Sequence, residues 1–141
     1  MKKDDQEQVR LAYHEAGHAA MVLIVGGAVH WVTLIPSKKF DAHTNATTFS
    51  PSAAVLVALS GDACERIRFR HASRGAHGDY ATAAKKIAPS RIPRYIDVAK
   101  ALLQLHWKGV EALAQELLRK KKMTGAEARN AFTVPGSGEP S

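Results

Sequence analysis

The spacing of apolar residues changes from helical to strand-like along the first third of this 141-residue chain. Helical spacing predicts a first helix over residues 5–25, which begins in an acidic segment and ends at Gly26 and Gly27. Residues 29–35 are rich in β-branched and aromatic side chains and predict a strand that Pro36 terminates. Residues 44–49 predict a partner strand, so a small sheet, such as a hairpin, should lie next to the first helix.

The remaining two thirds of the chain predicts helices. Ser50 and Pro51 supply an N-cap and a first-turn proline for a helix over residues 51–69. A loop over 70–78 follows, and then come the predicted helices, over residues 79–88, 94–119 (weakened or bent at Gly109) and 125–132. Thr124 and Glu127 form a capping-box pattern at the last of these. We therefore predict a mainly α fold with a small β element (α+β), comprising one domain over residues 1–133 and a disordered tail over 134–141.

Composition narrows the class of protein. Apolar residues make up 45% of the chain, which is enough for a core, and the apolar run after the first histidines is too short to cross a bilayer. Without a recognisable signal peptide, the expected location is the cytoplasm. The single cysteine, Cys64, excludes an internal disulfide and is expected to be a small core residue. The net charge is +7, but with 6% aromatic residues there is no stacking platform, which argues against nucleic-acid binding.

The first predicted helix contains the pattern His-Glu-x-x-His, formed by His14, Glu15 and His18. Residues four apart lie on one face of a helix, one turn above the other, so both imidazoles can point at one metal ion. Glu15 lies beside them, where it can deprotonate a water on that ion. Buried polar side chains need partners, and a metal ion would satisfy this group in an apolar helix. The pattern is typical of a zinc peptidase.

A catalytic zinc site usually has three protein ligands and one water, so a third ligand must come from another element. No further histidine follows His18 closely, and the next one is His30. The remaining candidates share a metal-binding side chain and lie later in the chain: Glu65, His71, His77, Asp79 and His106.

The residues themselves leave this choice open. Asp79 follows a glycine-bearing loop and opens a helix, where an ordinary N-cap explains a carboxylate better than a ligand does. Glu65 is a charged residue in an apolar helix, so it is either buried for a purpose or paired with Arg66 or Arg68. His71 and His77 are expected to be solvated in a loop, and His106 to be structural.

Three segments, in order, resemble the peptidase domain of FtsH-type ATP-dependent zinc metalloproteases. The first is the zinc-helix sequence Ala-Tyr-His-Glu-Ala-Gly-His-Ala, from Ala12 to Ala19. The second, Ser-Gly-Asp-Ala-Cys-Glu from Ser60 to Glu65, is similar to the family's Gly-Gly-x-Ala-Ala-Glu helix. The third, Gly-Ala-His-Gly-Asp-Tyr-Ala-Thr-Ala from Gly75 to Ala83, is similar to its Gly-Ala-x-x-Asp-x-x-x-Ala segment. The segment Met123-Thr124-Gly125-Ala126-Glu127 is also similar to the family's Leu-Thr-Gly-x-Glu ending.

This resemblance implies a zincin-like fold in which His14, His18 and Asp79 bind one zinc ion and Glu15 is the general base. It favours Asp79 over Glu65 as the third metal ligand. Glu65 would then contact one of the metal-binding side chains rather than the ion. It also implies that a strand beside the zinc helix, 29–35 or 44–49, pairs with extended substrate. The chain departs from the family in having no transmembrane helix and no phosphate loop, and Asp62 replaces the second glycine of the Gly-Gly pair.

The expected function is therefore a zinc metalloendopeptidase that hydrolyses flexible or unfolded polypeptides through a Glu15-activated, zinc-bound water, without its own ATPase. A separate unfoldase or adaptor, and an oligomer, remain open. The alternative is a catalytically silent, zinc-bound interaction or regulatory domain with the same fold. Metal content without cleavage of any unfolded substrate would favour that alternative.

Overall fold

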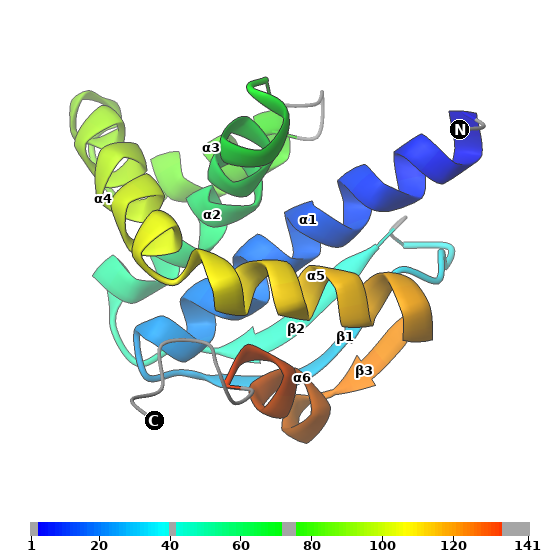
Figure 1. Ribbon diagram of the computed structural model, residues 1–141. Coiled ribbons are helices and arrows are strands. Elements are labelled where there is room, and N and C mark those ends of the chain that lie inside the picture. The colour runs from blue at the N-terminus through cyan, green and yellow to red at the C-terminus, as the bar shows by residue number, and fades with distance from the viewer. Residues whose placement is uncertain (1–2, 40–41, 72–75, 134–141) are drawn as a thin grey trace.

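The computed structural model describes residues 3–39, 42–71 and 76–133. Within them lie six α-helices, three strands and one 3-10 turn (Figure 1). The helices are α1 (Lys3–Ile24), α2 (Pro51–Phe69), α3 (Ala76–Ala84), α4 (Ile92–Leu105), α5 (Trp107–Lys120) and α6 (Gly125–Phe132). The strands are β1 (Ala28–Thr33), β2 (His43–Thr47) and β3 (Lys122–Thr124), and the 3-10 turn is η1 (Pro89–Arg91). The expected mainly α fold with a small β element is confirmed.

The sheet is antiparallel with the strand order β2-β1-β3, which leaves β2 at one edge. In the central strand, Val32 pairs with Thr44 of β2 on one side and with Met123 of β3 on the other. The predicted pairing of the first two strands is therefore confirmed, although both are shorter than expected. β3 was not predicted, because three residues are too few to show a period of two.

Helix α1 is the central element of the fold, with α2, α5 and the sheet packed around it (Figure 1). Its buried side chains are mostly small, so its neighbours can approach closely. At Gly17 a Cβ atom would lie only 2.4 Å from the backbone oxygen of Ser60 on α2. This glycine therefore sets the distance between α1 and α2, the two helices that carry the characteristic motifs.

Tyr13 anchors the other side of α1. Its ring stacks on Trp107 at a centroid distance of 6.1 Å and meets the edge of Phe69 at 5.7 Å. Its hydroxyl accepts a hydrogen bond of 3.2 Å from the Gln115 amide. Aromatic pairs of this kind favour one packing arrangement over its alternatives. The residue before His14 thus fixes how α1 is rotated about its axis.

The N-caps predicted at Ser50 and Thr124 are confirmed. The Ser50 hydroxyl accepts from the Ala53 N–H at the start of α2. Thr124 and Glu127 form a complete capping box at the start of α6. These caps satisfy N–H groups that have no partner within the helix.

The helix predicted over 94–119 is wrong in one respect, because it is two helices that join at His106. His106 leaves helical geometry, with φ −106° and ψ 23°, and is exposed rather than part of the core. Gly109 is not the break, since it lies buried inside α5 where a Cβ would collide with Phe132. The apolar spacing continues through the break, so periodicity alone cannot reveal it.

The loop predicted over 70–78 is also partly wrong, because α3 begins at Ala76, three residues before Asp79. Gly75 and Gly78 in the sequence favoured a loop, so the predicted start of this helix, at residue 79, is three residues too late. The predicted helix 79–88 ends at Ala84, and the predicted tail over 134–141 lies outside the described residues. No helix in the described part of the chain has the length and apolar character needed to cross a membrane.

Candidate metal centre

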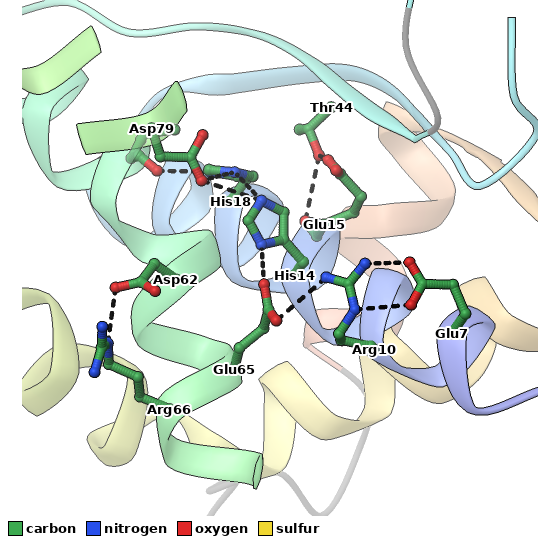
Figure 2. Close-up of polar contacts among 11 residues, drawn as sticks. Glu7, Arg10, His14, Glu15, His18, Thr44, Asp62, Glu65, Arg66 and Asp79 are labelled. Atoms are coloured by element: carbon green, nitrogen blue, oxygen red, sulfur yellow. Dashed lines mark hydrogen bonds and ion pairs between the residues drawn. The ribbon is translucent and has the colours of Figure 1, made fainter. Parts of the chain in front are cut away.

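His14 and His18 lie one turn apart on α1 and face the same side of it (Figure 2). Their rings meet edge to face with a centroid distance of 4.8 Å. The two Nε2 atoms are 3.1 Å apart. The spacing of four residues therefore brings two nitrogen donors to one point, as helix geometry requires.

Asp79 reaches the same point from α3 (Figure 2). Its Oδ2 lies 3.1 Å from the Nε2 of His14 and 3.4 Å from that of His18. The expected alternative, an N-cap, is wrong because Asp79 lies within the first turn of α3 and not ahead of it. The three donor atoms lie within 4.8 Å of one another, close enough to bind one ion.

The other ring nitrogen of each histidine faces an acceptor. His14 Nδ1 lies 2.5 Å from the Oε2 of Glu65, and His18 Nδ1 lies 2.7 Å from the backbone oxygen of Val57. Each acceptor holds a proton on Nδ1, so Nε2 is the nitrogen of each ring that can give up its proton and present a lone pair to a metal ion. Neutral rings in this tautomer therefore present two lone pairs to a carboxylate oxygen with no hydrogen between them.

That arrangement fits a metal ion. Oδ2 of Asp79 is buried and accepts no hydrogen bond from the described residues, although two ring nitrogens lie close to it. A buried carboxylate oxygen is costly unless a positive charge balances it, which protonated rings or a metal ion can supply. Two imidazole nitrogens and one carboxylate oxygen are a donor set that zinc accepts, with a fourth position open.

Gly61 leaves the space that the rings occupy. A Cβ on this residue of α2 would lie 2.5 Å from Nε2 of His18 and 2.6 Å from Nε2 of His14. Both distances are shorter than van der Waals contact, so the imidazoles could not keep their positions. The glycine that α2 retains from the family pattern therefore forms the floor of the site.

The electrostatics favour a positive charge between the three side chains. Burial lowers the pKa of His14, but the carboxylates of Asp79 and Glu65 outweigh burial and raise it to about 10. The pKa of His18 is raised by the same balance, with Asp79 as its main partner. Burial opposes ionisation of Asp79, yet the two rings hold its pKa well below its usual range. A proton or a metal ion can supply the charge that this group favours.

Glu65 contacts the side of the His14 ring that faces away from Asp79, and Arg10 in turn contacts Glu65 (Figure 2). Glu65 is 1% exposed, and its Oε1 accepts a hydrogen bond of 3.3 Å from Arg10. Arg10 is also paired with Glu7 at the surface. Glu65 is thus buried for a purpose, and its arginine partner is Arg10 rather than either arginine expected from α2.

Two residues that contact this group, Arg10 and Val57, were not predicted from the sequence. Arg10 lies one turn before His14 on α1, so its spacing was a usable signal for a residue on the same helix face. The backbone oxygen of Val57 carries no sequence signal, because any residue supplies a carbonyl. Arg66 instead pairs with Asp62, at 3.0 Å.

Glu15 is buried, with 6% of its surface exposed, and faces a cavity of about 450 Å³ that also contains His14, His18 and Asp79. The remaining lining is mostly small or apolar and includes several residues of β2 and α2. The Oε1 of Glu15 accepts a hydrogen bond of 2.7 Å from the hydroxyl of Thr44. A carboxylate beside the three donors, at the wall of an open cavity, is placed to exchange a proton with a molecule in that cavity.

His71 and His106, two of the other candidates, lie on the surface. His71 is exposed just after α2, and His106 is exposed between α4 and α5. His77 belongs to α3, but its side chain lies outside the described part. Cys64 is buried in the core as expected, and burial raises the pKa of its thiol.

Comparison with known proteins agrees with this geometry. The model of Peptidase family M41 matches residues 1–96. The ATP-dependent zinc metalloprotease FtsH of Leptotrichia buccalis is 28% identical over an alignment of 176 residues, which covers 88% of this chain. The chain spans 23% of the length of that relative. The alignment is longer than the chain, so the relative carries additional residues within the aligned region.

Fold and site together define a metallopeptidase-type domain with a zincin-like arrangement. The chain belongs to peptidase family M41, and its domain is of the FtsH peptidase type. The family resemblance inferred from the three motifs is therefore confirmed.

Proposed function

We propose that this chain is a zinc endopeptidase that hydrolyses flexible or unfolded polypeptides. The observation that carries the proposal is the meeting of the Nε2 atoms of His14 and His18 with the buried Oδ2 of Asp79, beside Glu15. His14, His18 and Asp79 would hold the ion. Bound zinc supplies Lewis acidity, which polarises a peptide carbonyl and makes water more acidic.

Glu15 would act as the general base and then as the general acid. Its carboxylate takes a proton from the attacking water and returns that proton to the nitrogen of the leaving amine. The water oxygen bonds to the carbonyl carbon and the C–N bond then breaks, so the products are one carboxylic acid and one amine, and the acid passes its proton to the amine in solution. Glu65 and the Val57 carbonyl keep the two rings in the tautomer that this arrangement requires.

Substrate would pair with β2. This strand lies at the edge of the sheet, whereas β1 is paired on both sides, so β2 is the better supported of the two expected strands. His43, Thr44 and Ala46 of β2 line the cavity that holds the site. An extended peptide added to this edge would run past Glu15, by the mode in which a strand joins an exposed sheet edge. That mode requires an unfolded segment, which sets the substrate class.

The 141 residues contain no phosphate-binding loop, so cleavage of an already unfolded chain should need no nucleotide. We further propose that residues 1–133 form the peptidase unit, and that an unfoldase or adaptor delivers folded substrates.

The test is cleavage of casein by zinc-loaded wild type and by Glu15→Gln, without ATP. We expect the variant to retain zinc but lose at least about a hundredfold in kcat/KM, the scale of general acid–base catalysis. Glu111→Gln, which changes an exposed residue of α5, is the matched control and should keep wild-type activity. Equal activity in wild type and Glu15→Gln would refute the role of Glu15. Zinc binding with no cleavage by wild type would support the silent, metal-bound domain instead.

A further inference from the structure

Thr44 connects the edge strand to the proposed base. Its hydroxyl lies 2.7 Å from Oε1 of Glu15 and 3.3 Å from the backbone oxygen of the same residue (Figure 2). Thr44 is half-buried in β2 and lines the cavity that also holds Glu15. The contact therefore joins an element expected to dock substrate to the helix that carries the metal-binding histidines.

Both oxygens near the Thr44 hydroxyl are acceptors, so the hydroxyl must donate its proton. The shorter distance, and the greater strength of a hydrogen bond to a charged group, assign that proton to the Glu15 carboxylate. Among the described residues, no other side chain is seen to donate to Glu15. Its Oε2 is then the oxygen left to exchange a proton with a water in the cavity.

A glutamate side chain has three rotatable bonds, and a general base must stay within hydrogen-bond reach of the proton that it takes. One strong hydrogen bond to Oε1 restricts those rotations and keeps the carboxylate turned toward the cavity. Thr44 pairs through its backbone with Val32 of β1, so the position of its hydroxyl is fixed by the sheet.

We propose that Thr44 is a positioning residue for Glu15, and that it aligns the base with a peptide bound along β2. The inference rests on the proposed function and adds a specific requirement to it. Substrate docking and the alignment of Glu15 then both depend on β2. The strand that binds the peptide therefore also holds the Glu15 carboxylate in position to act on it.

The test compares Thr44→Val and Thr44→Ser with wild type, all zinc-loaded and assayed on one flexible peptide. Valine keeps the shape of the side chain but removes the donor, whereas serine keeps the donor. Thr47→Val is the matched control, because Thr47 lies on the same strand as Thr44 but does not line the cavity, and its hydroxyl is 2.7 Å from Nε2 of His30 on β1.

We expect Thr44→Val to lower kcat by about ten- to a hundredfold, the scale of one hydrogen bond to a charged group. KM should stay within about twofold, because binding along the edge uses the backbone of β2. Thr44→Ser should recover kcat to within about threefold of wild type, and Thr47→Val should match wild type. Zinc content should be unchanged in all variants, which separates this role from a structural one.

Three results would overturn the inference while leaving the proposed function intact: wild-type kcat in Thr44→Val, equal losses in the valine and serine variants, or a loss confined to KM. A wild-type chain that cleaves nothing overturns the proposed function and, with it, this role. The two failures are therefore distinguishable in one set of assays.

Discussion

At the scale of single residues, two glycines determine whether the donor atoms can meet. Gly17 lets α1 approach the backbone of α2, and Gly61 leaves the space that both imidazoles occupy. Neither residue has a side chain that could bind a metal. Their contribution is the absence of a Cβ where any other residue would push the helices or the rings apart.

Gly61→Ala should therefore weaken metal binding without unfolding the chain. In a helix interior alanine is ordinarily favoured over glycine by about 1 kcal/mol, so a stability cost is not expected from propensity. The new Cβ would displace both rings, and we expect zinc affinity to fall by at least about tenfold. Competition with a chromophoric chelator measures this, and wild-type affinity in the variant would show that the rings need no such space.

Glu65→Gln tests the contact between the Glu65 carboxylate and Nδ1 of His14. Losing the carboxylate removes the strong acceptor for the Nδ1 proton and leaves Arg10 with one fewer charged partner. Zinc affinity should fall by about ten- to a hundredfold, the usual effect of losing such a partner.

Asp62→Asn is the control, because Asp62 is a buried carboxylate of the same helix that pairs with Arg66. It should keep wild-type affinity. Equal losses in the two variants would indicate a general effect of charge on α2 rather than support of His14.

At the scale of elements, prediction from sequence was best where local chemistry decides the structure. The Ser50 and Thr124 caps and the pairing of the first two strands depend on neighbouring residues, and all were found. The break at His106 and the short strand β3 depend on tertiary contacts, among them the contact of Gly109 with Phe132 and the pairing of Met123 with Val32. The spacing of apolar residues along the chain does not reveal such contacts.

The capping box of α6 provides a stability prediction at this scale. Thr124→Ala removes the acceptor for the Glu127 N–H and should lower the free energy of unfolding by about 1 kcal/mol. Urea denaturation of the metal-free protein measures the change. Thr133→Ala, at the other end of α6, should change stability by less than about 0.5 kcal/mol. A Thr124→Ala variant as stable as wild type would contradict the importance of this cap.

At the scale of the whole molecule, the candidate site joins α1 to α3, and α2 lies between them as a support. The histidine pair was predictable from sequence because four residues make one helical turn. Asp79 was not, since Glu65 was a rival candidate and the residues alone favoured an N-cap at Asp79. The family motif favoured Asp79 as the third ligand. The approach of the Asp79 side chain to the two rings depends on how α3 packs on α2.

Metal binding should release protons. The pKa of His14 is raised to about 10 and that of His18 is also raised, so at pH 7 the metal-free rings hold a proton that the ion must displace. We expect at least about one proton released per zinc at pH 7, and an apparent affinity that rises with pH from 6 to 9. Titration calorimetry in buffers of different ionisation enthalpy measures the release. A binding heat independent of the buffer would contradict it.

The most direct test of the account is the zinc content of the purified chain after saturation with zinc and removal of excess ion, measured by mass spectrometry of the metal. We predict one zinc per chain in wild type and less than about a tenth of that in Asp79→Ala, because the third ligand is lost. Asp97→Ala, which changes an exposed aspartate of α4, should keep the full amount. Full zinc content in Asp79→Ala, or none in wild type, would contradict the claim that these three side chains form a metal site.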